Sequence, residues 1–191
     1  MYFNFEQDIK EYFNKVTDVL SELDVGIISK VANLLVKTLN SEGTIYIFGN
    51  GGSASTASHF QNDFNRTLAD YSQKRFKVNC LSDNIPTITA IANDFSYDDV
   101  FVKQIENRLL ENDIVIAISG SGNSTNVVRA VEYAKAKAVK VVSFTGFDGG
   151  KLRFISDYNL NVGIDNMQIT EDVHLIFNHL LMTLIKNSFD N

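Results

Sequence analysis

The chain has 191 residues, and its 17 basic and 23 acidic side chains give a formal net charge of −6. Hydrophobic residues make up 45% and charged residues 21%, a balance that is typical of a globular domain and excludes a disordered chain. The acidic balance argues against a nucleic-acid partner, because no surplus of lysine and arginine exists to neutralise phosphates. It leaves open a small phosphorylated ligand, which backbone amides and hydroxyl groups can hold.

Three further features concern where the protein works. A single cysteine, Cys80, excludes a disulfide bond within the chain and is typical of a reducing compartment. The first 13 residues include acidic side chains and no apolar signal core. No apolar run reaches the roughly 18–20 residues of a membrane span. We therefore expect a cytoplasmic protein that does not act at a membrane.

Two amphipathic helices open the chain. Apolar residues recur at spacings of three and four over residues 5–22 and again over 25–40, which predicts a helix in each range. Both helices are more apolar than a helix with one solvated face needs. We interpret residues 1–40 as a helical N-terminal extension used in oligomerisation. Packing against the core of the same chain is the alternative.

Five short apolar runs predict strands that alternate with helices. The runs are 44–48, 76–81, 113–119, 139–145 and 157–162, and a long helix is predicted over 167–188. Strands that alternate with helices form a parallel sheet with helices on both faces. We therefore expect an α/β fold in one domain over 1–191. It is a doubly wound, five-stranded parallel sheet sandwich with N-terminal helices and a long C-terminal helix.

Two turns rich in glycine and serine follow predicted strands. The sequence GNGGSAS comes after 44–48, and ISGSGNST begins at the end of 113–119. Ligands of parallel sheets bind outside the C-terminal ends of the strands, where hydroxyls and helix N-terminal amides hold a phosphate without lysine. The residues expected to line this site are Asn50, Gly51, Gly52 and Ser53 in the first turn and Ser119, Gly120, Ser121 and Ser124 in the second.

Two common nucleotide sites do not match these turns. Neither turn has the Gly-Lys-Ser/Thr ending of a P-loop, and neither has the G-x-G-x-x-G spacing of a dinucleotide fold. The remaining alternative is that the glycines and serines only cap helices. Two such turns, each between an apolar strand and a helix, favour an anion site instead.

Several motifs together resemble one known family. They are the two turns, ASHF, AIANDFSYDDVFVKQIE, FTGFDGG and EDVHLIFNHLL, and their order resembles the phosphoheptose isomerase branch of the sugar isomerase (SIS) domain over nearly the whole chain. The resemblance implies the SIS fold and an aldose–ketose isomerase that converts sedoheptulose 7-phosphate to D-glycero-D-manno-heptose 7-phosphate through an enediol. It also implies a homotetramer with active sites at subunit interfaces.

Histidines and carboxylates supply candidate acid–base groups. His59 and Asp63 are four residues apart and share one face of the helix predicted after the first turn. The other histidines, His174 and His179, lie in the last helix, and we interpret His174 as structural. By resemblance to the family, Asp63 stands at the position of the catalytic base and His179 at that of the catalytic acid.

The resemblance also implies a zinc site and further sugar contacts. The zinc ligands by motif are His59, Asp63, Glu171 and His179, and the further sugar-binding residues are Asn93, Asp94 and Glu171. Two positions depart from the family, since Asp63 replaces a glutamate and Glu171 a glutamine. Two carboxylates would cancel the charge of Zn²⁺ and weaken its pull on a substrate oxygen, so Glu171 meeting a substrate hydroxyl is the alternative. Arg66 lies one residue earlier than the family arginine.

Other functions stay open at this stage. The chain could act on a related phosphosugar, or it could be a non-catalytic SIS module that regulates by binding a sugar phosphate or another protein. A sugar-phosphate sensor is a third possibility. The retained His59, Asp63 and His179 favour chemistry over binding alone, because proton transfer needs such groups.

Overall fold

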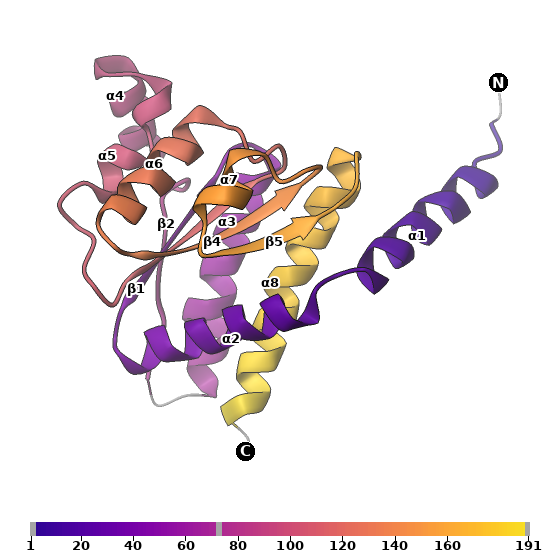
Figure 1. The fold of residues 1–191 in the computed structure, drawn as a ribbon, viewed down its shortest axis with the longest axis horizontal. Coiled ribbons are helices and arrows are strands. Elements are labelled where there is room, and N and C mark those ends of the chain that lie inside the picture. The colour runs from indigo at the N-terminus through magenta and orange to yellow at the C-terminus, as the bar shows by residue number, and fades with distance from the viewer. Residues whose placement is uncertain (1–2, 72–73, 190–191) are drawn as a thin grey trace.

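The order of the strands positions both glycine-rich turns. A computed structural model describes residues 3–71 and 74–189, and its strands form one parallel sheet in the order β2-β1-β3-β4-β5 (Figure 1). The strands are β1 (Thr44–Gly49), β2 (Lys77–Cys80), β3 (Ile114–Ser119), β4 (Lys140–Gly146) and β5 (Tyr158–Val162). All five match predicted runs. The winding of the chain reverses between β1 and β3, which is where sheets of this order bind ligands.

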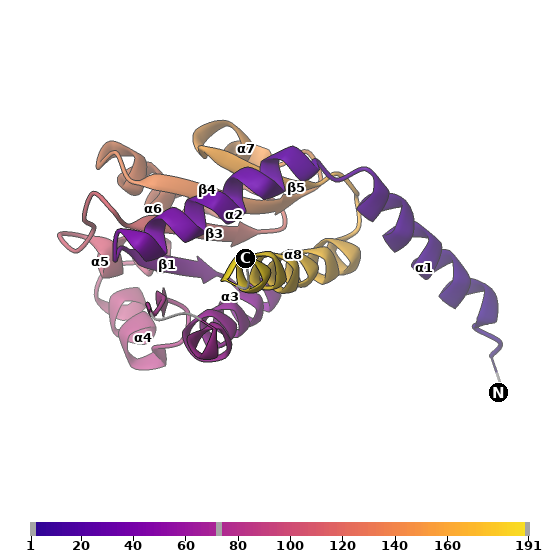
Figure 2. The same ribbon diagram turned by 90° about the horizontal axis from the view of Figure 1, so that it is seen from below.

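Helices cover both faces of the sheet, as the sequence predicts (Figures 1 and 2). On one face pack α2 (Val25–Asn40), α3 (Gly52–Asn62) and α8 (Met167–Phe189), and on the other α4 (Ile85–Asp94), α5 (Val102–Ile105), α6 (Thr125–Ala136) and α7 (Gly150–Ile155). Strand residues alternate between the two cores, so that Ile45 and Ile47 face the first and Tyr46 and Phe48 the second. The predicted doubly wound α/β fold is confirmed.

The segment between β2 and β3 holds helices that the sequence analysis did not predict. They are α4, the short 3₁₀ turn η3 (Tyr97–Asp99) and α5. The side chain of Asn84 caps α4 by accepting a hydrogen bond from the Thr87 amide at 3.1 Å, and Pro86 lies in the first turn. No residue of α4 is fully buried, although Ile85, Ile88 and Ile91 recur at helical spacing.

The first helix, α1 (Glu6–Ser21), stands away from the sheet (Figure 2). None of its residues is buried, and Ile9, Phe13 and Leu20 are exposed. The hydroxyl of Tyr12 donates a hydrogen bond to the carboxylate of Asp172 on α8. The apolar side of α1 therefore has little cover within one chain. Across the described residues, no helix has both the length and the apolar content to cross a membrane.

One face of α8 buries three polar side chains in the core. Thr170, His174 and Asn178 are fully buried and follow one another at intervals of four residues. Neither ring nitrogen of His174 makes a hydrogen bond of ordinary geometry with the described residues, although the backbone of Thr145 offsets part of the effect of burial on its pKa. Burial lowers the pKa of His174 from 6.5 to about 4, because the charged imidazolium would lose its hydration. The interpretation of His174 as a structural residue agrees with this environment.

Replacing His174 with leucine should make the stability of the fold less dependent on acidic pH. The unfolded chain protonates this histidine below about pH 6.5, whereas the folded chain keeps it neutral down to about pH 4. Protonation therefore favours unfolding as the pH falls, by about 2 kcal/mol between pH 7.5 and 5. Urea denaturation of both proteins at pH 7.5 and pH 5 measures the difference. An equal loss of stability in parent and variant would contradict the assignment.

Candidate active site

The first turn joins β1 to α3 at the C-terminal edge of the sheet. Gly51 has a φ of +54°, a left-handed conformation that glycine adopts without steric cost. Asn50 and Asn126 exchange two side-chain hydrogen bonds of 2.9 and 3.0 Å, and the Tyr97 hydroxyl donates to Asn50 Oδ1 at 2.9 Å. The turn is therefore held in place by side chains from α6 and η3.

The second turn joins β3 to α6 and supplies hydroxyl groups. The Oγ atoms of Ser119 and Ser124 lie 3.2 Å apart, and Ser124 precedes α6 without making a side-chain capping bond. Gly122 has a φ of +64°, and a Cβ there would lie 2.0 Å from the carbonyl oxygen of Gly149. Hydroxyls gathered at a helix N-terminus suit an anion such as phosphate.

Both turns line one small pocket of about 130 Å³, called the serine pocket below. Its lining residues are Asn50, Ser53, Ile118, Ser119, Gly120, Ser121, Ser124, Met167 and Glu171. The pocket lies where β1 and β3 end side by side, as the strand order requires. It is smaller than the roughly 300–1,000 Å³ of a site that encloses a whole ligand, so it suits one end of a substrate.

Glu171 lies in this pocket and not with the histidines. A Cβ on Gly52 would lie 2.4 Å from Glu171 Oε2, so the carboxylate packs against the backbone of the first turn. The family resemblance implies Glu171 as a zinc ligand, but the cluster of metal-binding groups found among the described residues consists of His59, Asp63 and His179. The observed position agrees with the alternative in which Glu171 meets a substrate hydroxyl.

The predicted acid–base groups meet between α3 and α8, which lie side by side in both ribbon views (Figures 1 and 2). The Nε2 atoms of His59 and His179 are 3.3 Å apart. Asp63 Oδ2 lies 3.4 Å from the first of these nitrogens and 3.7 Å from the second. The Asp63 side chain is 10% exposed, whereas the two imidazoles are 42% and 49% exposed. The carboxylate therefore forms the buried side of a cluster that opens outward.

The same three groups fit a zinc ion. Ligand atoms at 2.0–2.1 Å from a tetrahedral zinc lie about 3.3–3.4 Å from one another. The three separations here are 3.3, 3.4 and 3.7 Å. Three protein ligands leave the fourth position open, which is typical of catalytic rather than structural zinc. The cluster is therefore a candidate metal site.

The chain leaves the α-helical path directly at Asp63. A π-helical turn, η1 (Asp63–Thr67), extends α3 and leads into the 3₁₀ turn η2 (Leu68–Asp70). A π turn adds a residue to the helical repeat and so redirects the side chains that follow. Arg66 forms an ion pair of 2.7 Å with Asp70, and these side chains are 70% and 63% exposed. The displaced arginine thus pairs at the surface and does not join the cluster.

Two predicted sugar contacts lie apart from the pocket. Asn93 and Asp94 are exposed at the end of α4, where Asn93 Nδ2 donates to Asp94 Oδ1 at 2.9 Å. Neither residue lines the serine pocket, so their role at the sugar stays a prediction. Conversely, sequence reasoning missed four residues that contact the site, because each reaches it only through tertiary packing. They are Tyr97, Asn126, Met167 and Asn178.

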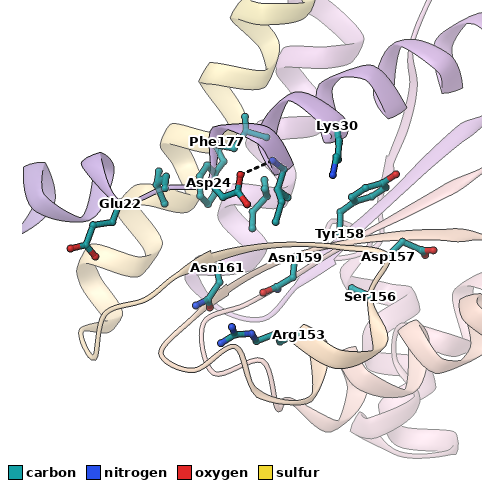
Figure 3. A pocket seen from close by; sticks show the side chains of 14 residues that line it. Glu22, Asp24, Lys30, Arg153, Ser156, Asp157, Tyr158, Asn159, Asn161 and Phe177 are labelled. Atoms are coloured by element: carbon teal, nitrogen blue, oxygen red, sulfur yellow. Dashed lines mark hydrogen bonds between the residues drawn. The ribbon is translucent and has the colours of Figure 1, made fainter.

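A larger cavity, of about 540 Å³, lies between the start of α2 and the edge strand β5 (Figure 3). Side chains of both charges border it, among them Asp24, Lys30 and Arg153. No residue predicted for the active site lines this cavity. Size therefore does not identify the active site here, whereas the arrangement of hydroxyls, imidazoles and carboxylates does.

Comparison with known proteins identifies the family. A family model described as the SIS domain matches residues 11–146. The phosphoheptose isomerase of Helicobacter pylori strain 26695 is 38% identical over 182 residues, which cover 94% of this chain and 91% of that protein. This chain belongs to the phosphoheptose isomerase branch of the SIS domain family. The family predicted from the motifs is thus confirmed.

Two further members of the branch agree along almost their whole length. The probable phosphoheptose isomerase of Thermoplasma acidophilum is 34% identical over 182 residues, covering 95% of this chain and all (100%) of that protein. The structure of the phosphoheptose isomerase of Neisseria gonorrhoeae matches with a TM-score of 0.88 at 28% identity, covering 96% of this chain and 100% of that one. The likeness to these proteins therefore extends beyond residue 146, where the family model ends, into the segment that holds α7, β5 and α8.

Replacing Glu171 with glutamine should strengthen phosphate binding in the serine pocket. The carboxylate shares a pocket of about 130 Å³ with Ser119, Ser121 and Ser124, so it repels a bound phosphate dianion. Removing one negative charge should lower the dissociation constant of inorganic phosphate roughly two- to tenfold. Isothermal titration at low ionic strength measures the change. Ser124→Ala is the control and should raise the dissociation constant of phosphate, because it removes a hydroxyl donor. Unchanged affinity in both variants would place the anion site elsewhere.

Proposed function

We propose that this chain is an aldose–ketose isomerase that converts sedoheptulose 7-phosphate to D-glycero-D-manno-heptose 7-phosphate. One observation carries the proposal. A hydroxyl-lined pocket and an acid–base cluster lie at different points along the same two helices. Glu171 at the pocket and His179 in the cluster are eight residues apart on α8, which is about 12 Å along the helix axis. That separation suits a substrate with a phosphate at one end and a carbonyl at the other.

The proton transfers follow from the positions of Asp63 and His179. The ketose loses a proton from C1 to the Asp63 carboxylate, and an enediol forms between C1 and C2. Asp63 returns a proton to C2, while His179 moves a proton from the oxygen on C1 to the oxygen on C2. The product is the aldose, and every proton removed is replaced. The half-exposed imidazole and the buried carboxylate act on the same opening between α3 and α8.

Zinc is the proposed metal for the cluster of His59, Asp63 and His179. When bound, it would polarise a substrate oxygen and so favour the enediol. Support comes from the nitrogen and oxygen donors, which lie within 4.8 Å of one another. With Glu171 in the serine pocket, one carboxylate and two neutral imidazoles would hold the ion. The charge of the site would then stay positive, which favours binding of an anionic enediol.

The proposal extends to the whole chain. Residues 1–191 form a single SIS domain that works in the cytoplasm as a homotetramer, with active sites at subunit interfaces and residues 1–40 in subunit contacts. Support comes from α1 and its N-cap residue, where Phe5, Ile9 and Phe13 are exposed to solvent in one chain. Exposed aromatic and aliphatic side chains in such a row are typical of protein interfaces. Residues 1–2 of this extension lie outside the described part.

The substitutions His179→Asn and Asp63→Asn should each lower kcat at least about 100-fold, because each removes a proton-transfer group. The assay follows aldose formation from sedoheptulose 7-phosphate in deuterium oxide, together with deuterium uptake next to the carbonyl. Arg66→Ala is the matched control and should keep the parent rate, since Arg66 pairs with Asp70 at the surface. Turnover by either asparagine variant at the parent rate would remove that residue from the mechanism.

The purified chain should bind about one Zn²⁺ per subunit, and His59→Ala should weaken binding at least about tenfold. Competition with a chelator of known affinity measures both values. Cys80→Ala is the control and should bind as the parent does. Burial raises the pKa of the Cys80 thiol to about 12, so no thiolate is available to the metal. Equal zinc affinity in the parent and in His59→Ala would contradict the proposed ligand set.

A further inference from the structure

We propose that Asn178 is the positioning residue that fixes the Asp63 carboxylate for proton transfer, an inference that rests on the proposed function. Asn178 Nδ2 donates a hydrogen bond of 2.9 Å to Asp63 Oδ2. Asp63 Oδ2 is also the atom that lies 3.4 Å from His59 Nε2 and 3.7 Å from His179 Nε2. The amide thus binds the carboxylate oxygen that faces both imidazoles.

Asn178 and His179 approach Asp63 from different directions. They are adjacent on α8, so their side chains leave the helix about 100° apart. Asn178 is fully buried, whereas the His179 side chain is 49% exposed. The Asp63 carboxylate therefore lies between a fixed amide on the core side and an imidazole on the open side. An amide inside the core has little room to move, so it holds its partner in one orientation.

The chemistry of the pair leaves one orientation for the amide. An ionised carboxylate accepts hydrogen bonds and donates none, so Asn178 must present its NH₂ group to Asp63. Its Oδ1 then points away and lacks a partner among the described residues. An unpaired buried oxygen lowers stability, and an apolar side chain would avoid that cost. The asparagine is therefore better explained by its contact with Asp63 than by packing.

Because the aspartate side chain is short, a residue that fixes the Asp63 carboxylate matters more at this position. Asp63 has one methylene fewer than the glutamate of the family, and it begins the π-helical turn η1. The other hydrogen bond to its carboxylate comes from the exposed Asn62, whose Nδ2 lies 3.4 Å from Oδ1 and so binds weakly. The bond from Asn178 is the shorter and the better shielded of the two. It therefore decides where Oδ2 lies.

The first test replaces Asn178 with leucine, which has a similar volume and no donor. We expect kcat for the sugar phosphate to fall at least about tenfold while KM changes less than about twofold. A crystal structure of the variant should show Asp63 Oδ2 turned out of reach of at least one imidazole. Asn159→Leu is the matched control, because it removes a hydrogen-bonded asparagine from β5, away from the cluster. It should lower stability without lowering kcat.

The second test, Asn178→Asp, keeps the shape of the side chain and so guards against a variant that fails to fold. The substitution removes the NH₂ donor that holds Asp63 Oδ2, so kcat should fall at least about tenfold while KM changes less than about twofold. Parent-like kcat in both variants, or an unmoved Asp63 carboxylate in the leucine variant, would overturn the proposal. A parent chain that isomerises no sugar phosphate would refute the proposed function instead, and the crystal structure would still decide the positioning.

Discussion

The backbone pairing of β1 with β3 is the constraint on which the rest of the site depends. These strands are far apart in sequence but adjacent in the sheet, with Gly49 opposite Ile118. The two glycine-rich turns therefore leave the same edge, and their hydroxyls line one pocket. Because the winding reverses between these strands, the helices that follow them diverge and leave room for a ligand. If another strand lay between β1 and β3 in the sheet, the two turns would be separated.

The packing of α3 against α8 adds a cluster of candidate catalytic residues to this ligand-binding edge of the sheet. Both helices run from the serine pocket to the cluster of His59, Asp63 and His179, so one pair of elements fixes two ends of a substrate. Burial is graded across the cluster, from the enclosed Asp63 to the half-exposed imidazoles. A carboxylate in such a place needs a hydrogen-bond donor from the core, and Asn178 supplies it.

The three departures from the family pattern lie at separate places in the structure. Asp63 is shorter than glutamate, and a buried amide holds it. Glu171 replaces glutamine and packs against Gly52 in the serine pocket. Arg66 comes one residue early, on a π-helical turn, and pairs with Asp70 at the surface. The charges of the site are thus redistributed, with one carboxylate at the imidazoles and another beside the predicted phosphate position.

The sequence by itself determined the alternation of strands and helices, the two glycine-rich turns and the family, because local periodicity and short motifs encode these features. It also indicated His59 with Asp63, which share a helix face. Tertiary structure alone decided that His179 joins them, that Glu171 stays in the serine pocket, and that Asn178 reaches Asp63 from 115 positions away in the chain. Such contacts depend on how α8 packs against α3, and no local pattern encodes the rotation of one helix against another.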